Sequence, residues 1–139
     1  MESKNKIAVI GLGYVGLPLA LEFSKKYSVI GLDINLERVN ELNDYHDKTN
    51  EINKKDLKNR LSSGLKLTSD YKEIKDCNIY IVTVPTPINS LRQPDLSCLF
   101  SASKSIGKIL KKNDIIIYES TVYPGCTEED CVPILEKNS

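Results

Sequence analysis

Short runs of β-branched and other apolar residues alternate along this chain with longer segments that carry apolar residues at helical spacing. Five of the runs are expected to be strands, at 7–10, 28–32, 65–68, 79–84 and 115–118. Most are apolar throughout rather than at every second position, which is typical of parallel strands covered on both faces. Helices are expected at 12–23, 35–42, 53–61 and 96–110, and another is expected to begin near Thr127. This order predicts an α/β fold with a doubly wound, mainly parallel sheet.

Length and charge fit one domain of this kind. The chain has 139 residues, no Gly/Ser-rich linker, and as many acidic as basic residues, 19 of each. A zero net charge gives no field that would attract nucleic acid or an anionic membrane surface. The first residues contain no apolar segment long enough for a signal peptide or a membrane span. We therefore expect a single cytoplasmic domain over 1–139, without a nucleic-acid or membrane partner.

The cysteines and the single histidine do not predict a metal site. The cysteines, at 77, 98, 126 and 131, lack the paired spacing of zinc ligands, and we expect reduced thiols. His46 lies between acidic residues in a polar stretch, which favours a surface position. No metal is therefore expected.

A glycine-rich segment joins the first expected strand to the first expected helix. It reads Gly11-Leu12-Gly13-Tyr14-Val15-Gly16, the pattern G-x-G-x-x-G. Gly11 permits a tight turn, Gly13 lets the backbone approach a pyrophosphate, and Gly16 lets the helix pack on the strand. The start of the helix offers free N–H groups to the phosphates. The segment therefore predicts a dinucleotide-binding domain of the Rossmann type.

Asp33 ends the second expected strand, about 20 residues after Gly11, where such domains place the carboxylate that binds ribose hydroxyls. A 2′-phosphate beside it would be repelled by at most about 4 kcal/mol per charge pair. NAD rather than NADP is therefore expected. Arg38, in the next helix, leaves three possibilities open: it covers the adenine, it pairs with a 2′-phosphate and weakens the preference, or it lies in solvent.

Two further loops follow strands at the same edge of the sheet. Val84-Pro85-Thr86-Pro87 follows the fourth strand, and Glu119-Ser120-Thr121-Val122-Tyr123-Pro124-Gly125 follows the fifth. Hydroxyl groups in such loops bind ribose or pyrophosphate, but the residue pattern alone fits ordinary turns equally well.

Segments 10–18, 82–87 and 119–125 together resemble the UDP-glucose/GDP-mannose dehydrogenase family, over essentially the whole chain. Segments 93–96 and 123–129 are similar to its branch that oxidises UDP-N-acetylhexosamines for surface polysaccharides. The resemblance implies that the amides of Tyr14 and Val15 contact the pyrophosphate of NAD, that Asp33 holds the ribose and that Arg38 lies by the adenosine. It also implies that the loops with Val84, Pro85, Thr86, Ser120 and Thr121 flank the nicotinamide half, and that Thr121 helps to order a water near the reacting carbon.

Enzymes of this family use two NAD to convert the primary alcohol of the sugar into a carboxylate through a cysteine thioester. The resemblance provides no counterpart here for that cysteine, the active-site lysine, the sugar-binding domain or the sixth strand. We therefore expect no catalytic residue in this chain, NAD binding without turnover, UDP-sugar binding only through the missing domain, and a parent that is a homodimer or larger.

Two alternatives share the glycine pattern and Asp33. One is a stand-alone NAD-sensing regulatory module, which needs no catalytic half. The other is a dehydrogenase of the same superfamily that acts on hydroxyacids, and the loops at 84–87 and 120–122 argue against it.

Overall fold

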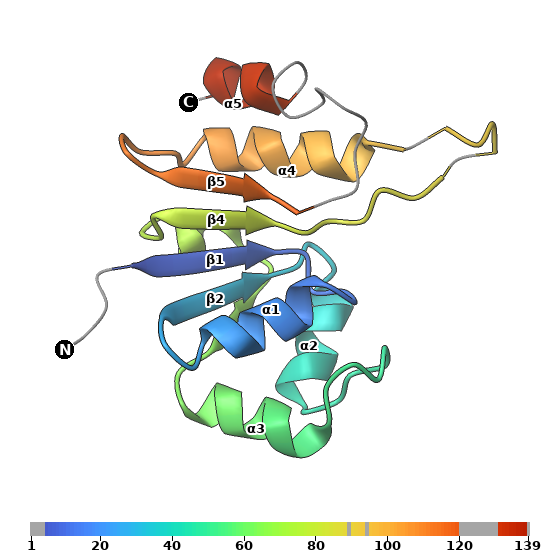
Figure 1. The fold of residues 1–139 in the computed structure, drawn as a ribbon, viewed down its shortest axis with the longest axis vertical. Coiled ribbons are helices and arrows are strands. Elements are labelled where there is room, and N and C mark those ends of the chain that lie inside the picture. The colour runs from blue at the N-terminus through green and yellow to red at the C-terminus, as the bar shows by residue number, and fades with distance from the viewer. Residues whose placement is uncertain (1–4, 89, 94, 120–130, 139) are drawn as a thin grey trace.

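The computed structural model describes residues 5–88, 90–93, 95–119 and 131–138. Its five strands form one parallel sheet in the order β3-β2-β1-β4-β5, with their carboxyl ends on the same side (Figure 1). The strands are β1 (Lys6–Ile10), β2 (Ser28–Leu32), β3 (Lys66–Thr68), β4 (Ile79–Val82) and β5 (Ile115–Tyr118). The predicted doubly wound sheet is confirmed, although β4 ends two residues earlier than expected.

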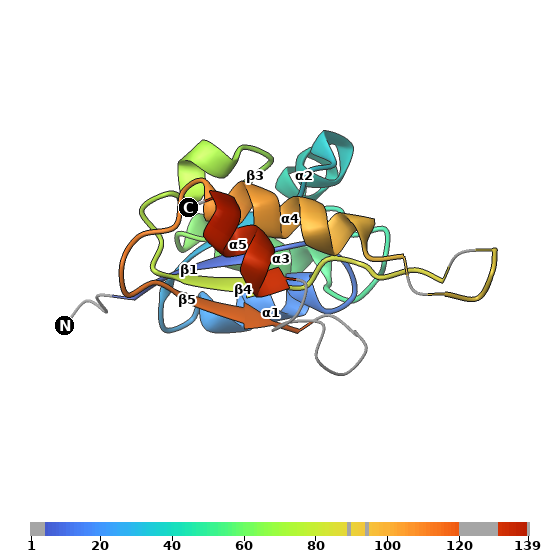
Figure 2. The ribbon, with the colours of Figure 1, turned by 90° about the horizontal axis from the view of Figure 1, so that it is seen from above.

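Helices cover both faces of the sheet (Figure 2). They are α1 (Gly16–Phe23), α2 (Leu36–Asn43), α3 (Lys54–Ser62), the short 3₁₀ helix η1 (Tyr71–Ile74), α4 (Ser97–Gly107) and α5 (Val132–Asn138). Figure 2 shows α4 and α5 on one side of the sheet and α1 on the other. The first helix was expected from residue 12 but begins at Gly16, because residues 11–15 form the loop that precedes it. The predicted start near Thr127 lies outside the described residues.

The alternation of β1 side chains between the two faces explains why the strands are apolar throughout. Ala8 and Ile10 pack into a cluster with η1, α4 and α5, whereas Ile7 and Val9 pack into a second cluster with α1 and α3. Both faces of β1 are therefore closed to water, which is the usual arrangement for a central parallel strand.

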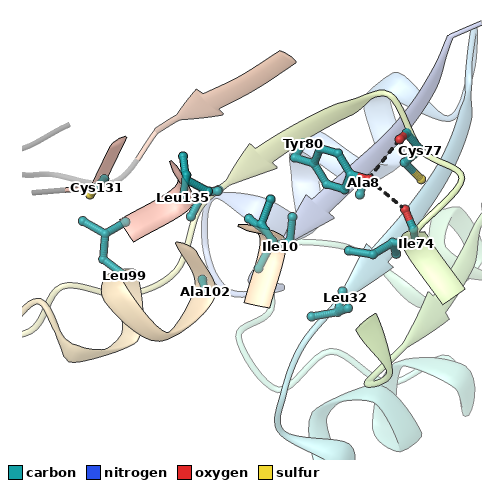
Figure 3. Close-up of a cluster of buried hydrophobic side chains, with 12 residues drawn as sticks. Ala8, Ile10, Leu32, Ile74, Cys77, Tyr80, Leu99, Ala102, Cys131 and Leu135 are labelled. Atoms are coloured by element: carbon teal, nitrogen blue, oxygen red, sulfur yellow. Dashed lines mark hydrogen bonds between the residues drawn. The ribbon is translucent and has the colours of Figure 1, made fainter. Parts of the chain in front are cut away.

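The first cluster contains two of the cysteines, Cys77 and Cys131, both buried and neither in a disulfide (Figure 3). Tyr80 is fully buried there, and its hydroxyl lies 3.0 Å from the Cys77 carbonyl oxygen and 3.2 Å from that of Ile74. Burial raises the pKa of the Cys77 thiol to about 11, so it stays protonated. These cysteines pack as small apolar side chains, as expected from the sequence.

β5 differs from the inner strands because one of its faces is open. Ile116 and Tyr118 pack against the first cluster, whereas Ile115 and Ile117 are 53% and 38% exposed. β5 pairs with β4 along one edge, and no other strand among the described residues pairs with it. The sheet thus has an apolar edge region on the side of β5 opposite α4.

Candidate dinucleotide-binding site

A pocket of about 570 Å³ opens at the carboxyl ends of β1, β2 and β4. This is the position at which doubly wound folds bind their ligands, and the volume lies within the range of cofactor sites. The predicted residues that line it are Gly11, Gly13, Tyr14, Val15, Asp33, Arg38, Val84, Pro85 and Thr86. Ser120 and Thr121 lie outside the described residues.

The glycines of the loop between β1 and α1 have separate structural roles. Gly11 has φ +99°, and a Cβ there would lie 2.9 Å from the Thr83 carbonyl. A Cβ on Gly16, which is buried beneath the loop, would lie 1.7 Å from the Gly11 carbonyl oxygen. A Cβ on Gly13 would meet no protein atom within 4 Å. Gly11 and Gly16 are thus required by the fold, whereas Gly13 leaves open space on the pocket side.

Thr83 fixes this loop from the neighbouring strand, a role that the sequence analysis missed. Its hydroxyl donates to the Gly11 carbonyl at 2.8 Å and lies 3.0 Å from that of Ile10. Thr83 follows β4 directly, and β4 pairs with β1, so the hydroxyl reaches the turn as β1 ends. The sequence feature that could have indicated this role is the position of Thr83, a residue with a hydroxyl group directly before the Val84-Pro85 loop.

The first turn of α1 suits an anion. Its N-cap residue, Val15, makes no side-chain capping hydrogen bond, and the turn carries no acidic residue. The amide groups at this end therefore lack the partners that a capping side chain supplies, and they carry the positive end of the helix dipole. Tyr14 and Val15 are exposed here, with their side chains away from the core.

Asp33 is oriented by two backbone amides. Its Oδ2 accepts from Leu12 N at 3.0 Å, and its Oδ1 accepts from Asn35 N at 2.9 Å. Each carboxylate oxygen has two lone pairs, so acceptor positions remain for ribose hydroxyls. Asn35 in turn caps α2 by accepting from Glu37 N at 3.0 Å. The carboxylate is thus held in place at the pocket before a ligand arrives.

Arg38 does not lie in solvent, so that possibility was wrong: the residue is only 5% exposed. Its Nε donates to the Leu12 carbonyl at 2.8 Å, and its Nη1 pairs with Asp47 Oδ1 at 2.9 Å and Glu41 Oε1 at 3.2 Å. Nη2 is buried without a hydrogen-bond partner among the described residues. The guanidinium therefore links α2 to the glycine-rich loop.

Asp47 organises the segment after α2. Its side chain is fully buried and accepts from Thr49 Oγ1 at 2.6 Å and from the backbone amides of Thr49, Glu51 and Ile52 at 2.9–3.0 Å. Burial raises the pKa of Asp47, but these hydrogen bonds and the one from Arg38 outweigh it and lower the pKa to about 2. Lys48 and Thr49 are thereby held at the pocket wall. The sequence analysis placed no function in this segment, although an Asp followed by Thr two residues later is a typical turn signal.

Two helices that sequence reasoning did not assign to the site complete the wall: Tyr71 of η1 and Cys98, Ser101 and Ala102 of α4 line the pocket. Glu119, the first residue of the predicted loop after β5, also lines it. Burial, and then the charge of Asp33, raise the pKa of Tyr71 to about 12, so its phenol is neutral. The wall is therefore mostly apolar with a few polar groups, as is usual for cofactor sites.

The described part of the chain shows neither a cluster of metal-ligating side chains nor a membrane-spanning helix. No three His, Cys, Asp or Glu side chains there lie close enough together to hold a metal ion. The helices of that part include none with the length and apolarity needed to cross a bilayer. The open space at Gly13, the amides of α1 and the oriented Asp33 carboxylate together fit a dinucleotide.

Comparison with known proteins agrees with this geometry. The model of the UDP-glucose/GDP-mannose dehydrogenase family, NAD binding domain, matches residues 5–139. The chain is 59% identical over 134 residues to a UDP-N-acetyl-D-glucosamine 6-dehydrogenase of Pseudomonas aeruginosa, covering 96% of this chain and 31% of the relative. It is 55% identical, with the same coverage, to the enzyme of that name from Salmonella typhi.

A solved structure shares the fold. The UDP-D-ManNAc dehydrogenase of Pyrococcus horikoshii superposes with a TM-score of 0.87 at 38% identity, over 96% of this chain and 32% of that one. The chain thus spans about a third of the length of the proteins it matches.

Proposed function

Because the chain belongs to the UDP-glucose/GDP-mannose dehydrogenase family, as an NAD-binding domain, we propose that it is the cofactor-binding part of a nucleotide-sugar 6-dehydrogenase. The parent enzyme would oxidise a UDP-hexose or UDP-N-acetylhexosamine to the uronic acid with two NAD, in the cytoplasm, for surface polysaccharide biosynthesis. The identity of 59% to a UDP-N-acetyl-D-glucosamine 6-dehydrogenase favours the N-acetylhexosamine as substrate.

The observation that carries the proposal is the arrangement of Asp33 and the glycine-rich loop at one pocket. Gly13, with open space around it, shortly precedes the uncapped start of α1, which suits a pyrophosphate. Asp33 lines the same pocket, where the ribose of the adenosine would bind. In this assignment Gly11, Gly13, Tyr14, Val15 and Gly16 form the pyrophosphate site, Asp33 and Arg38 the adenosine site, and Val84, Pro85, Thr86, Ser120 and Thr121 the nicotinamide site.

The chemistry divides between this chain and the rest of the parent. NAD would supply the hydride acceptor, and residues of this chain would bind and orient the cofactor. Thr121 is proposed to help order a water, and no residue of this chain is proposed to act as the nucleophile. The sugar would be held by the part of the parent beyond the third matched here. The open face at Ile115 and Ile117 is consistent with a domain that packs against further chain. The parent is proposed to be a homodimer or larger.

The test has two arms. Calorimetric titration of this chain with NAD is expected to show saturable binding, and incubation with NAD and UDP-N-acetylglucosamine, UDP-N-acetylgalactosamine or UDP-glucose is expected to yield no NADH. Absence of NAD binding, or NADH formation by this chain alone, would contradict the proposal.

The second arm concerns the native polypeptide in its source cells, detected with an antibody against this chain. A polypeptide several-fold longer than 139 residues that reduces NAD with one of these UDP-sugars supports the enzyme. A native polypeptide of about this length would instead favour the NAD-sensing regulatory module.

A further inference from the structure

The Arg38 guanidinium is surrounded by carboxylates although it lies at the cofactor pocket. Nη1 lies 2.9 Å from Asp47 Oδ1 and 3.2 Å from Glu41 Oε1, and all three side chains are largely withdrawn from solvent. An arginine near the ribose-binding carboxylate is the usual means by which a Rossmann pocket accepts the 2′-phosphate of NADP. Here the charge of that arginine is already matched inside the protein.

The charged side chains around Asp33 and Arg38 also disfavour a phosphate when they are summed. Asp33, Glu41 and Asp47 are negative, and Arg38 and Lys48 are positive; the Lys48 ammonium lies 3.8 Å from Glu41 Oε1. Three carboxylates against two cations leave one net negative charge. A 2′-phosphate placed beside Asp33 would therefore meet a repulsive field despite the nearby arginine.

The donors of Arg38 are also withdrawn from a ligand. Nε is used by the Leu12 carbonyl, and Nη1 by the two carboxylates. Nη2 has no partner among the described residues, but it is buried, so a phosphate in the pocket does not reach it. The compensated charge therefore disfavours a phosphate, and no exposed donor of the guanidinium offsets that effect.

We propose that Glu41 and Asp47 strengthen the preference that Asp33 gives for NAD: they neutralise Arg38, so that the pocket accepts the free 2′-hydroxyl of NAD and rejects the 2′-phosphate of NADP. The inference rests on the proposed function, because it takes Asp33 and Arg38 as the adenosine end of the NAD site. Glu41 and Asp47 are positioning residues, since they act through Arg38. The Glu41 carboxylate contacts the two cations, Arg38 and Lys48, whereas Asp47 also holds the segment after α2.

The test is the ratio of the dissociation constants for NADP and NAD, measured by calorimetry on this chain with NADP titrated by displacement of NAD. Glu41→Gln keeps the acceptor and removes the charge, and it is expected to lower the ratio roughly three- to tenfold. Asp47→Asn is expected to lower it in the same direction. Glu37→Gln removes a charge from an exposed position of the same helix that does not line the pocket, and it is expected to leave the ratio unchanged.

A merely structural role would weaken NAD and NADP alike and leave the ratio constant. An unchanged ratio in Glu41→Gln, with NAD still bound, would overturn the inference, and this variant decides alone if Asp47→Asn does not fold. Failure of the unsubstituted 139-residue chain to bind NAD would instead contradict the proposed function. High salt is expected to reduce the difference in this ratio between the unsubstituted chain and Glu41→Gln, because salt screens the charges.

Discussion

Asp33 and Arg38 hold opposite ends of the same backbone residue, Leu12. Asp33 Oδ2 accepts from the Leu12 amide at 3.0 Å, and Arg38 Nε donates to the Leu12 carbonyl at 2.8 Å. The anion and the cation of the proposed adenosine end are thus both tied to the glycine-rich loop. Cofactor affinity and loop geometry should therefore change together when either side chain is altered.

Asp33→Ala is expected to weaken NAD binding by about ten- to a hundredfold, because it removes a charged acceptor and releases the Leu12 amide. It should also bring the affinities for NAD and NADP closer together. Calorimetry with both cofactors measures this. Asp70→Ala is the matched control, since Asp70 also accepts a backbone amide, from Lys72 at 2.9 Å, but does not line the pocket. Equal losses in the two variants would contradict the role of Asp33.

Two glycine substitutions are expected to change different properties: Gly16→Ala should lower stability, and Gly13→Ala should lower NAD affinity. A methyl group at Gly16 would lie 1.7 Å from the Gly11 carbonyl oxygen, so the free energy of unfolding should fall by about 3 kcal/mol or more. At Gly13 the methyl group meets no protein atom, so stability should change little while NAD affinity falls. Thermal unfolding and NAD titration of both variants separate the two effects. Normal NAD affinity in Gly13→Ala would show that the pyrophosphate does not approach this residue.

The alternation of strands and helices was predictable because parallel strands buried on both faces leave a strong apolar signal. Ile7 through Ile10 show this, since neighbouring residues enter different clusters and all are buried. The glycine pattern predicted the turn because two of its requirements arise within a short stretch of chain: the left-handed φ of Gly11 and the close approach of Gly16 to the Gly11 carbonyl.

The contacts that complete the site join residues distant in sequence, and these were not predictable. Arg38 reaches Leu12 and Asp47 only after α2 folds onto the glycine-rich loop, so its burial could not be inferred from a helix with charged neighbours. Tyr71 and Cys98 reach the pocket from η1 and α4 in the same way. Their residue types carried no motif, and only the packing of the elements brings them to the site.

Thr83→Val tests the newly found support for the loop. The substitution keeps the shape but removes the hydroxyl that donates to the Gly11 carbonyl at 2.8 Å, and we expect a stability loss of about 1 kcal/mol. NAD affinity should fall several-fold because the turn is less well fixed. Thr68→Val is the control, since the Thr68 hydroxyl accepts from Asp70 N at 3.1 Å and Thr68 does not line the pocket. A loss of NAD affinity in both variants would assign the effect to general destabilisation.

The buried Asp47 carboxylate predicts a dependence of stability on acid. Its pKa is about 2 in the folded chain against 3.8 for an ordinary aspartate, so the folded state favours the charged form. The stabilisation, about 2 kcal/mol, is complete above pH 4 and is lost as the pH falls towards 2.

Urea unfolding at a series of pH values should therefore show a steeper fall in the free energy of unfolding below pH 4 for the unsubstituted chain than for Asp47→Asn. The variant has no carboxylate to protonate at this position. Thr49→Val removes the hydroxyl that lies 2.6 Å from Asp47 Oδ1, so it should raise the pKa of Asp47 and reduce this acid-dependent contribution. If the free energy of unfolding depends on pH in the same way for the unsubstituted chain and for Asp47→Asn between pH 4 and 2, Asp47 titrates as it does in the unfolded chain. The hydrogen bonds around it would then give no preference for its charged form, and the segment from 47 to 52 would have to be held by other contacts.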